Sequence, residues 1–191
     1  MFRRKRVKVG MLKDRVFIEK RPRIIEKRGR VGDAEADFIL SGKGGRGILL
    51  TLTDRKLRLP FIEKILPVSI PAVERALMRI KRRFLELRTI TFDNDILLQH
   101  HQRLERILGV QIYFCHPYSS FEKGSIENVN GRIRRYIPKG SNIATYSRPF
   151  IRKLEGRLQT RPLKCLGYAT PEEALERHRK RVISAQTKNA P

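Results

Sequence analysis

The order of short apolar segments is the feature of this chain that most constrains its fold. Three strand-like segments come first, separated by a glycine-rich turn and a charged turn, and they span 36–40, 48–53 and 57–65. Helical patterns then alternate with two more short apolar segments, at 88–92 and 110–115. A strand meander followed by alternating helices and strands predicts an α/β fold with a mixed five-stranded sheet flanked by helices.

Five longer helices are predicted from apolar periodicity and from residues that favour helix ends. Pro71 suits a first helical position, Gly109 suits a helix end, and Thr170 with the acids after it has the form of a capping box. The predicted helices span 71–84, about 96–108, 126–136, 147–158 and a stretch that starts at Thr170. A shorter helix is predicted within 18–27, inside an otherwise extended basic segment.

Lysine and arginine outnumber acidic residues by 43 to 19, so the formal net charge is +24. Such a charge favours a polyanionic partner, because phosphate contacts release counterions, and nucleic acid is the leading candidate. No apolar run approaches the ~20 residues of a membrane-spanning helix, and no apolar segment follows the basic start as it would in a secretory signal. The two cysteines lie in unrelated contexts, which predicts reduced thiols and no zinc site.

Two acidic residues lie in distinctive runs. Asp93 ends a predicted buried strand, and Glu127 lies at the start of a predicted helix. Asp37 could complete a set of three, but Asp33 and Glu35 share its strand face, and periodicity does not choose among them. Carboxylates are the ligands that Mg²⁺ or Mn²⁺ prefers, and two such ions about 3.5–4 Å apart assist phosphodiester cleavage. The pattern therefore predicts metal-assisted chemistry on a polyanion.

The helix that carries Glu127 has two different faces. Its apolar stripe predicts the buried side and consists of Ile126, Val129 and Ile133. Residues at offsets of three, four and seven share the face of Glu127, namely Asn130, Gly131 and Arg134. A glycine inside a helix costs roughly 1 kcal/mol relative to alanine, which would be explained by a backbone passing close to it. An ordinary solvated helix face explains the pattern equally well.

Several runs of the chain form a recognisable set. They include Asp37 within 32–39, the segment 50–56, and Thr89-Ile90-Thr91-Phe92-Asp93-Asn94. The most specific block runs from Pro117 to Gly140, with Lys123-Gly124-Ser125, Glu127-Asn128, Asn130-Gly131, Arg134 and Pro138-Lys139-Gly140. Further matches are Arg161-Pro162, the run 164–168 and Thr170-Pro171. Together these runs, over roughly residues 14–175, resemble the integrase-type catalytic core of bacterial insertion-sequence transposases, most closely the family numbered thirty.

The resemblance implies a ribonuclease-H-like fold and a D-D-E triad. By motif position, Asp37, Asp93 and Glu127 would be both the catalytic residues and the ligands of two Mg²⁺ or Mn²⁺ ions. The implied activity is DNA transposition, in which water frees a 3′-hydroxyl at the element end and that hydroxyl attacks target DNA. Residues implied to support the site or contact DNA are Asn94, Lys123, Asn128, Asn130, Arg134, Arg135 and Lys139.

The implied partner is double-stranded DNA, both element ends and target, bound by a homo-oligomer. No membrane and no small-molecule substrate is expected, and the expected location is the bacterial cytoplasm, at the nucleoid. The predicted organisation is a basic N-terminal arm over 1–31, an integrase-type core over 32–178 and a disordered tail over 179–191.

The chain departs from the family pattern in three places. Ala34 stands where tryptophan is usual, and the run 95–98 replaces a usual Gly-x-Glu-Phe, so Asp95 must accept the backbone that the glycine adopts. The helix-turn-helix region that precedes this core in family members is not seen. These departures leave an alternative reading, a truncated and catalytically impaired remnant that binds DNA without cutting it.

Overall fold

A five-stranded mixed sheet forms the centre of the computed structural model, which describes residues 14–116 and 123–188. The strand order is β3-β2-β1-β4-β5. The strands are β1 (Asp33–Leu40), β2 (Ile48–Asp54), β3 (Pro60–Ile65), β4 (Thr89–Phe92) and β5 (Gln111–Phe114). The meander from β1 to β3 is antiparallel, whereas β4 runs parallel to β1 and β5 runs parallel to β4. This architecture confirms the predicted α/β fold.

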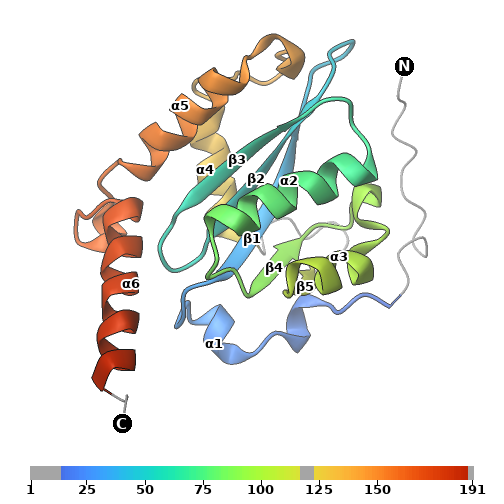
Figure 1. The fold of residues 1–191 in the computed structure, drawn as a ribbon. Coiled ribbons are helices and arrows are strands. Elements are labelled where there is room, and N and C mark those ends of the chain that lie inside the picture. Colours follow the sequence, from blue (N-terminus) through green and yellow to red (C-terminus); the bar gives the residue numbers. More distant parts are fainter. Residues whose placement is uncertain (1–13, 117–122, 189–191) are drawn as a thin grey trace.

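Helices cover both faces of the sheet (Figure 1). One face packs against α2 (Ile70–Arg83) and α3 (His101–Leu108), around a core that includes Leu50 and Leu77. The other face packs against α4 (Gly124–Ile133) and α5 (Arg148–Gln159), around a second apolar cluster. Since successive strand residues point to opposite faces, Ala36 of β1 lies in the first core while Glu35 and Asp37 face α4.

Several element bounds differ from the sequence prediction for local reasons. β1 begins three residues earlier than predicted, and β3 begins at Pro60 rather than at 57, because Arg58 adopts a φ of 58° in the preceding turn. The helix predicted over 96–108 is divided, because the Asp95 side chain caps a short 3-10 helix, η2 (Ile96–Leu98), before α3 starts. Gly109 ends α3 with a φ of 61°, as predicted.

The segment predicted as an extended basic arm packs against the core from residue 14 onward. Pro22 interrupts the predicted helix because its ring favours an extended residue before it, leaving η1 (Ile18–Lys20) and α1 (Arg23–Glu26). Ile18 and Ile25 are buried. Phe17 forms a parallel bridge to Phe114, so this segment covers part of the outer edge of β5. Residues 14–31 are therefore an integral part of the domain, which corrects the prediction.

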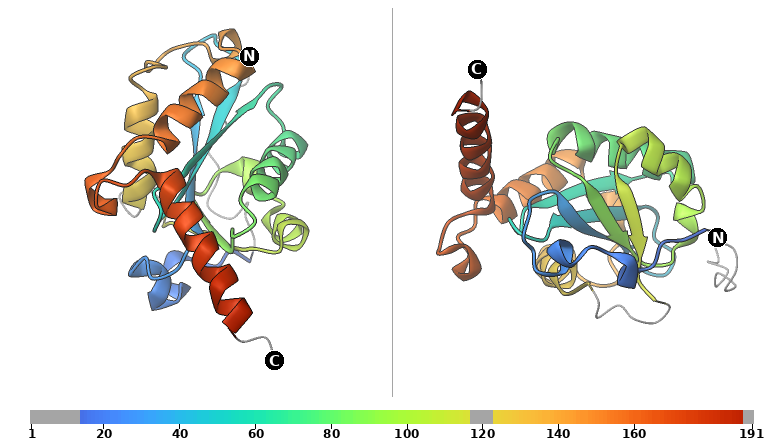
Figure 2. Two further views of the ribbon diagram at one scale, coloured as in Figure 1. Left: turned by 60° about the vertical axis from the view of Figure 1, so that its left-hand side comes forward. Right: turned by 90° about the horizontal axis from the view of Figure 1, so that it is seen from below.

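The last helix, α6 (Pro171–Lys188), runs through most of the region predicted as a disordered tail. Its capping box forms as predicted, with the Glu173 N–H donating to Thr170 Oγ1 at 3.1 Å. The tail prediction for 179–191 is wrong over 179–188, because this stretch contains no glycine or proline and many good helix formers. Leu175 joins the core, whereas residues 181–187 are exposed and α6 projects beyond the sheet (Figure 2). None of the described helices is long and apolar enough to cross a membrane.

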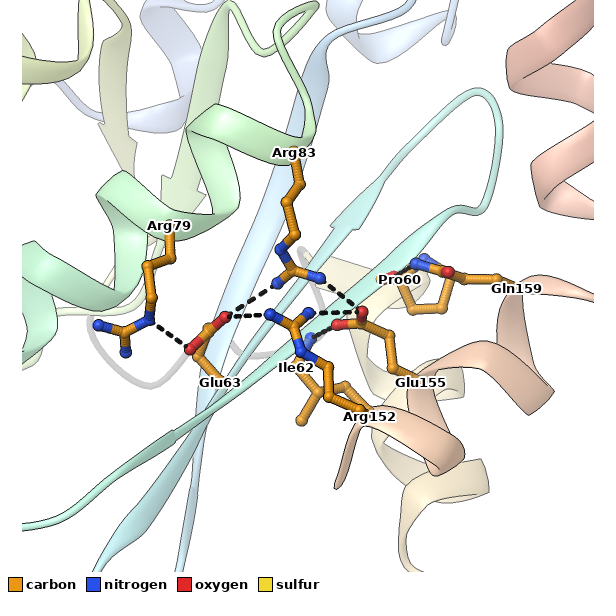
Figure 3. A network of polar contacts seen from close by, with 8 residues as sticks. All are labelled: Pro60, Ile62, Glu63, Arg79, Arg83, Arg152, Glu155 and Gln159. Carbon is orange, nitrogen blue, oxygen red and sulfur yellow. Dashed lines mark hydrogen bonds and ion pairs between the residues drawn. The ribbon is translucent and has the colours of Figure 1, made fainter. Parts of the chain in front are cut away.

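Side chains of α5 close the outer edge of β3 (Figure 3). The backbone N–H of Ile62 donates to Glu155 Oε2 at 2.5 Å, and Gln159 Nε2 donates to the Pro60 carbonyl at 2.7 Å. These bonds satisfy backbone groups that an edge strand otherwise leaves open. Two further 3-10 helices, η4 (Ile143–Thr145) and η5 (Lys164–Leu166), lie before and after α5.

An ion-pair network ties this edge to both helical layers (Figure 3). Arg83 of α2 binds Glu155 of α5 at 2.5 Å and Glu63 of β3 at 2.9 Å. Arg79 also pairs with Glu63, and Arg152 pairs with Glu155 at 3.1 Å. The two glutamates are nearly fully buried, so each depends on these arginines for compensation of its charge.

Candidate active site

Two neighbouring strands place two carboxylates side by side. The parallel register pairs Glu35 of β1 with Thr91 of β4, and two residues further along the chain lie Asp37 in β1 and Asp93 directly after β4. The ammonium of Lys123 lies 3.0 Å from Asp93 Oδ2 and 3.6 Å from Asp37 Oδ1. One cation is thus shared between acids that are far apart in the sequence.

Burial distinguishes the members of this cluster. The Lys123 side chain is 2% exposed, and its ammonium also donates to the Ala36 carbonyl at 3.3 Å. Asp37 and Asp93 are 34% and 44% exposed, so both carboxylates remain accessible from solvent. Burial raises the pKa of Asp37 and Asp93 adds to that rise, whereas the positive charge of Lys123 opposes it.

Asn130 of α4 orients Asp37 from the other side. Its Nδ2 donates to Asp37 Oδ2 at 2.8 Å, while its Oδ1 accepts from Thr51 Oγ1 at 2.9 Å. Thr51 is the register partner of Asp37 on β2, which explains how its hydroxyl reaches the same amide. The threonine thus fixes which end of the Asn130 amide faces the carboxylate.

Glu127 does not meet the two aspartates. It is exposed on α4, and its carboxylate forms no hydrogen bond or ion pair with a described residue. The predicted face is nevertheless correct, since Asn130, one turn further along, reaches Asp37. A Cβ added at Gly131 would meet nothing within 4 Å, so a close backbone does not explain that glycine among the described residues.

The structure separates the three acids of β1, which periodicity leaves equivalent. Asp33 is fully buried and binds Arg30 through both carboxylate oxygens. Glu35 is also buried, pairs with Arg55 at 3.0 Å, and accepts the backbone N–H groups of Ser125 and Ile126. Glu35 therefore caps the start of α4 and positions the helix that carries Glu127. Sequence reasoning missed this role, because no local pattern links Glu35 to a helix 90 residues away.

The other predicted site residues fall into two groups. Asn94 ties strand ends together, since its Nδ2 donates to the Cys115 carbonyl at 2.6 Å and its Oδ1 accepts from Arg15. Arg134 is half-buried and donates to the Pro138 carbonyl at 3.3 Å. The remaining three are exposed on or just after α4, namely Asn128, Arg135 and Lys139. Pro117–Ser120 and Glu122 lie outside the described residues.

The sequence departures have simple structural outcomes. Asp95 has a φ of −99°, so it does not need the left-handed backbone that a glycine would permit. Its Oδ1 accepts the Leu97 N–H at 3.0 Å and starts η2. Ala34 is buried in the core on the α2 face of the sheet.

The acidic cluster offers only oxygen ligands to a divalent cation. Among residues 14–116 and 123–188, no three His, Cys, Asp or Glu side chains converge closely enough to hold a metal ion. The two aspartates nevertheless fit a shared cation, because both already face one ammonium. Oxygen-only ligands with room for water match the preference of Mg²⁺.

Comparisons with known proteins find similar sequences and folds, although no family model matches the sequence. The chain is 39% identical over 165 residues to the transposase of insertion sequence element IS4351 from Bacteroides fragilis, covering 86% of this chain and 50% of that protein. It is 33% identical over 165 residues to the transposase InsI of element IS30A from Escherichia coli K12, covering 84% and 42%. The chain thus spans about half the length of the curated relatives it matches.

Solved structures share the fold at low sequence identity. The catalytic core domain of BIV integrase matches with a TM-score of 0.61 and 16% identity, covering 79% of this chain and 98% of that one. A chain of the simian T-cell lymphotropic virus intasome matches with a TM-score of 0.62 and 14% identity, covering 74% and 52%. The fold is therefore that of a ribonuclease-H-like integrase catalytic core. Over about 165 residues the chain is thus similar in sequence to transposases of insertion sequence elements, IS30A among them.

Proposed function

We propose that this chain is the catalytic core of a DNA transposase that cuts and joins phosphodiester bonds at the ends of an insertion sequence. The observation that carries the proposal is the shared cation position between Asp37 and Asp93, beside the helix that holds Glu127. The transposase relatives support this function and do not favour the alternative of a DNA-binding remnant.

Asp37, Asp93 and Glu127 are proposed as the catalytic residues and as ligands of Mg²⁺ or Mn²⁺, two ions in all. Bound ions of this kind activate an attacking oxygen and neutralise charge at the leaving oxygen. Asp37 and Asp93 would hold the cations, because both carboxylates face one ammonium and stay partly exposed to solvent. Glu127 lies one helical turn from Asn130, which already bonds Asp37, so rotation of its side chain would bring it toward the pair.

Double-stranded DNA is the proposed substrate, both as element end and as target. The formal charge of +24 favours this polyanion, and Asn128, Arg134, Arg135 and Lys139 are proposed to contact it beside the acidic site. A homo-oligomer on DNA is proposed because one structural neighbour is described as an intasome. The proposed location, the cytoplasm at the nucleoid of a bacterium, rests on the bacterial origin of the relatives.

The test is cleavage of a labelled duplex taken from the genomic flanks of the reading frame, in the presence of Mg²⁺ or Mn²⁺. Asp37→Asn, Asp93→Asn and Glu127→Gln should each lower the cleavage rate by about 100-fold or more, because each removes a charge that acts on the transition state. Asp95→Asn is the matched control, since asparagine can still cap η2 and only one nearby charge is lost.

The outcomes separate the two functions. Cleavage by the parent that survives Asp95→Asn and is lost in the three site variants supports a transposase core. Cleavage by Asp93→Asn at the parental rate would show that the acidic site is wrongly assigned. Tight, salt-sensitive binding with no cleavage in either metal would instead identify a DNA-binding remnant.

A further inference from the structure

An arginine in the turn between β2 and β3 adopts a backbone conformation that its residue type disfavours. Arg58 has a φ of 58°, in the left-handed region that glycine and asparagine accept more readily. It lies between two buried leucines, Leu57 and Leu59, and its N–H donates to the Asp54 carbonyl at 2.9 Å. Such a conformation has an energetic cost that other contacts must offset. The structure therefore favours a role for the arginine side chain itself.

The Arg58 side chain reaches the first turn of α4. Its Nη1 donates to Ser125 Oγ at 2.6 Å, across 67 positions of the chain. Ser125 is only 4% exposed. A hydrogen bond from a charged donor contributes more than one between neutral groups, and more again where little water competes for it. The β2–β3 turn is therefore joined directly to the helix that carries Glu127.

A second arginine of the same turn reaches the same helix indirectly. Arg55 Nε lies 3.0 Å from Glu35 Oε1, and both side chains are buried. Glu35 Oε2 in turn accepts the backbone N–H groups of Ser125 at 2.9 Å and of Ile126 at 3.0 Å. The β2–β3 turn thus contacts the first turn of α4 by two routes, one through a side chain and one through the backbone.

The start of α4 depends on these outside contacts. Lys123, the residue before the helix, provides no side-chain cap to it. Gly124, the first helical residue, restricts the backbone less than another residue type would. The first N–H groups of the helix therefore need acceptors from elsewhere in the chain. Since this turn lies between Lys123 and Glu127 in sequence, its placement determines where Glu127 lies relative to the two aspartates.

We propose that Arg58 is a positioning residue that holds the first turn of α4 and so fixes the position from which Glu127 acts with the two aspartates. Arg55 contributes to the same hold through the buried carboxylate with which it pairs. The inference rests on the proposed function only for the role of Glu127, and the hold on α4 is independent of it. A site whose supporting contacts fix its side chains in advance needs less reorganisation during the reaction.

Arg58→Asn separates the side-chain contact from the backbone conformation. Asparagine accepts a left-handed backbone and is too short to reach Ser125. Hydrogen exchange of the backbone amides of 125–130 is measured on the full chain by mass spectrometry, in EDTA and without DNA. We expect exchange about tenfold faster or more than in the parent, because a hydrogen bond from a charged donor is lost. The Tm should change by less than about 3 °C, because relief of backbone strain offsets that loss.

Two further variants test whether the contact is the cause. Tyr168→Asn places asparagine at another left-handed position, with a φ of 64° and a side chain that is 71% exposed, and should leave exchange of 125–130 unchanged. Arg58→Lys keeps a cationic donor on the same backbone and should recover most of the protection. Parental exchange in Arg58→Asn, or an equal rise in Tyr168→Asn, would overturn the proposal.

Cleavage kinetics respond to positioning in a way that stability does not. In the assay with metal and labelled duplex, Arg58→Asn should lower the rate at saturating DNA by about tenfold or more. The DNA concentration that gives half the maximal rate should change little, and Arg58→Lys should regain most of the rate. A loss that appears only in that DNA concentration would mean that Arg58 acts in DNA binding, and would overturn the proposal.

The exchange result is independent of the cleavage assay, because neither metal nor DNA is present. Faster exchange in Arg58→Asn of a protein that never cuts DNA would support the hold on α4 while the proposed function fails. Cleavage by Arg58→Asn at the parental rate would overturn the role of Arg58 and leave the proposed function intact.

Discussion

At the scale of single residues, the positive charge of Lys123 offsets the repulsion between the carboxylates of Asp37 and Asp93. Its ammonium is buried and contacts both carboxylates. Lys123→Met should lower the free energy of unfolding in EDTA by about 1–2 kcal/mol, less than for a fully buried pair because both carboxylates keep contact with water. Millimolar Mg²⁺ should then raise the Tm of the variant more than that of the parent, as measured by thermal unfolding.

Lys81→Met is the control for Lys123. Lys81 is partly buried, and its ammonium donates to the backbone carbonyls of Leu85 and Leu87 instead of to carboxylates. Its loss should lower the Tm with no added response to Mg²⁺. An equal Mg²⁺ response in the Lys123 variant and the parent would contradict a shared cation position.

Asp54 makes stability depend on pH. It is fully buried at the end of β2, and burial raises its pKa to about 6 even though three backbone N–H groups donate to it. The unfolded chain titrates lower, at about 3.9, so the folded state holds the proton more tightly. The stabilising contribution is therefore complete below pH ~4 and is lost as pH rises to about 6.

Urea unfolding from pH 4 to pH 7 measures this effect. The stability of the parent relative to Asp54→Asn should fall by about 2–3 kcal/mol between pH ~4 and ~6 and change little above that range. Glu172→Gln, at an exposed position of α6, should show no such pH dependence relative to the parent. A stability difference between the parent and Asp54→Asn that stays constant with pH would rule out the raised pKa.

At the scale of elements, the contact between α5 and β3 depends on one carboxylate. Glu155→Ala removes the acceptor of the Ile62 N–H and the partner that Arg83 and Arg152 share. We expect a loss of about 3 kcal/mol in the free energy of unfolding, as for a buried ion pair that loses one member. Glu176→Ala, at an exposed position of α6, should change stability by less than about 0.5 kcal/mol in the same urea titration. A similar loss of stability in both variants would show that Glu155 contributes no more than an exposed glutamate.

The same elements show how far the sequence could predict the structure. Period-two alternation correctly placed Asp33, Glu35 and Asp37 on one strand face, and capping chemistry correctly placed the start of α6. The different roles of the three acids come from Arg30, Arg55 and Lys123, of which the last two lie in distant parts of the chain. The proximity of Asp37 and Asp93 depends on the pairing of β1 with β4, which no local pattern specifies.

The extent of the domain was predicted less well. Burial of Ile18 and Ile25 could not be distinguished from a solvated basic arm, because lysine and arginine surround both residues. The continuation of α6 could not be distinguished from a tail, because its second half has no core contacts to impose a pattern. The family resemblance supplied the site residues that the pattern alone left open, and their catalytic roles stay a prediction.

At the scale of the whole molecule, the boundary of the stable domain can be located by truncation. Removal of residues 181–191 should change the free energy of unfolding by less than about 0.5 kcal/mol, because 181–187 are exposed. Removal of residues 171–191 takes Leu175 away from the core and breaks the Arg179–Glu86 pair. This should lower the free energy of unfolding by about 2–3 kcal/mol. Urea titration of both truncated proteins provides the measurement, and a large loss from the shorter deletion would move the boundary beyond 180.

The covered edges of the sheet also limit how copies of this protein can assemble. Side chains of α5 occupy the edge of β3, and the segment around Phe17 occupies part of the edge of β5. A second copy therefore finds little open strand on which to extend the sheet. Any multimer that gathers on one DNA molecule must be joined through helices, turns or chain termini, so its symmetry is determined by helical surfaces and not by strand pairing.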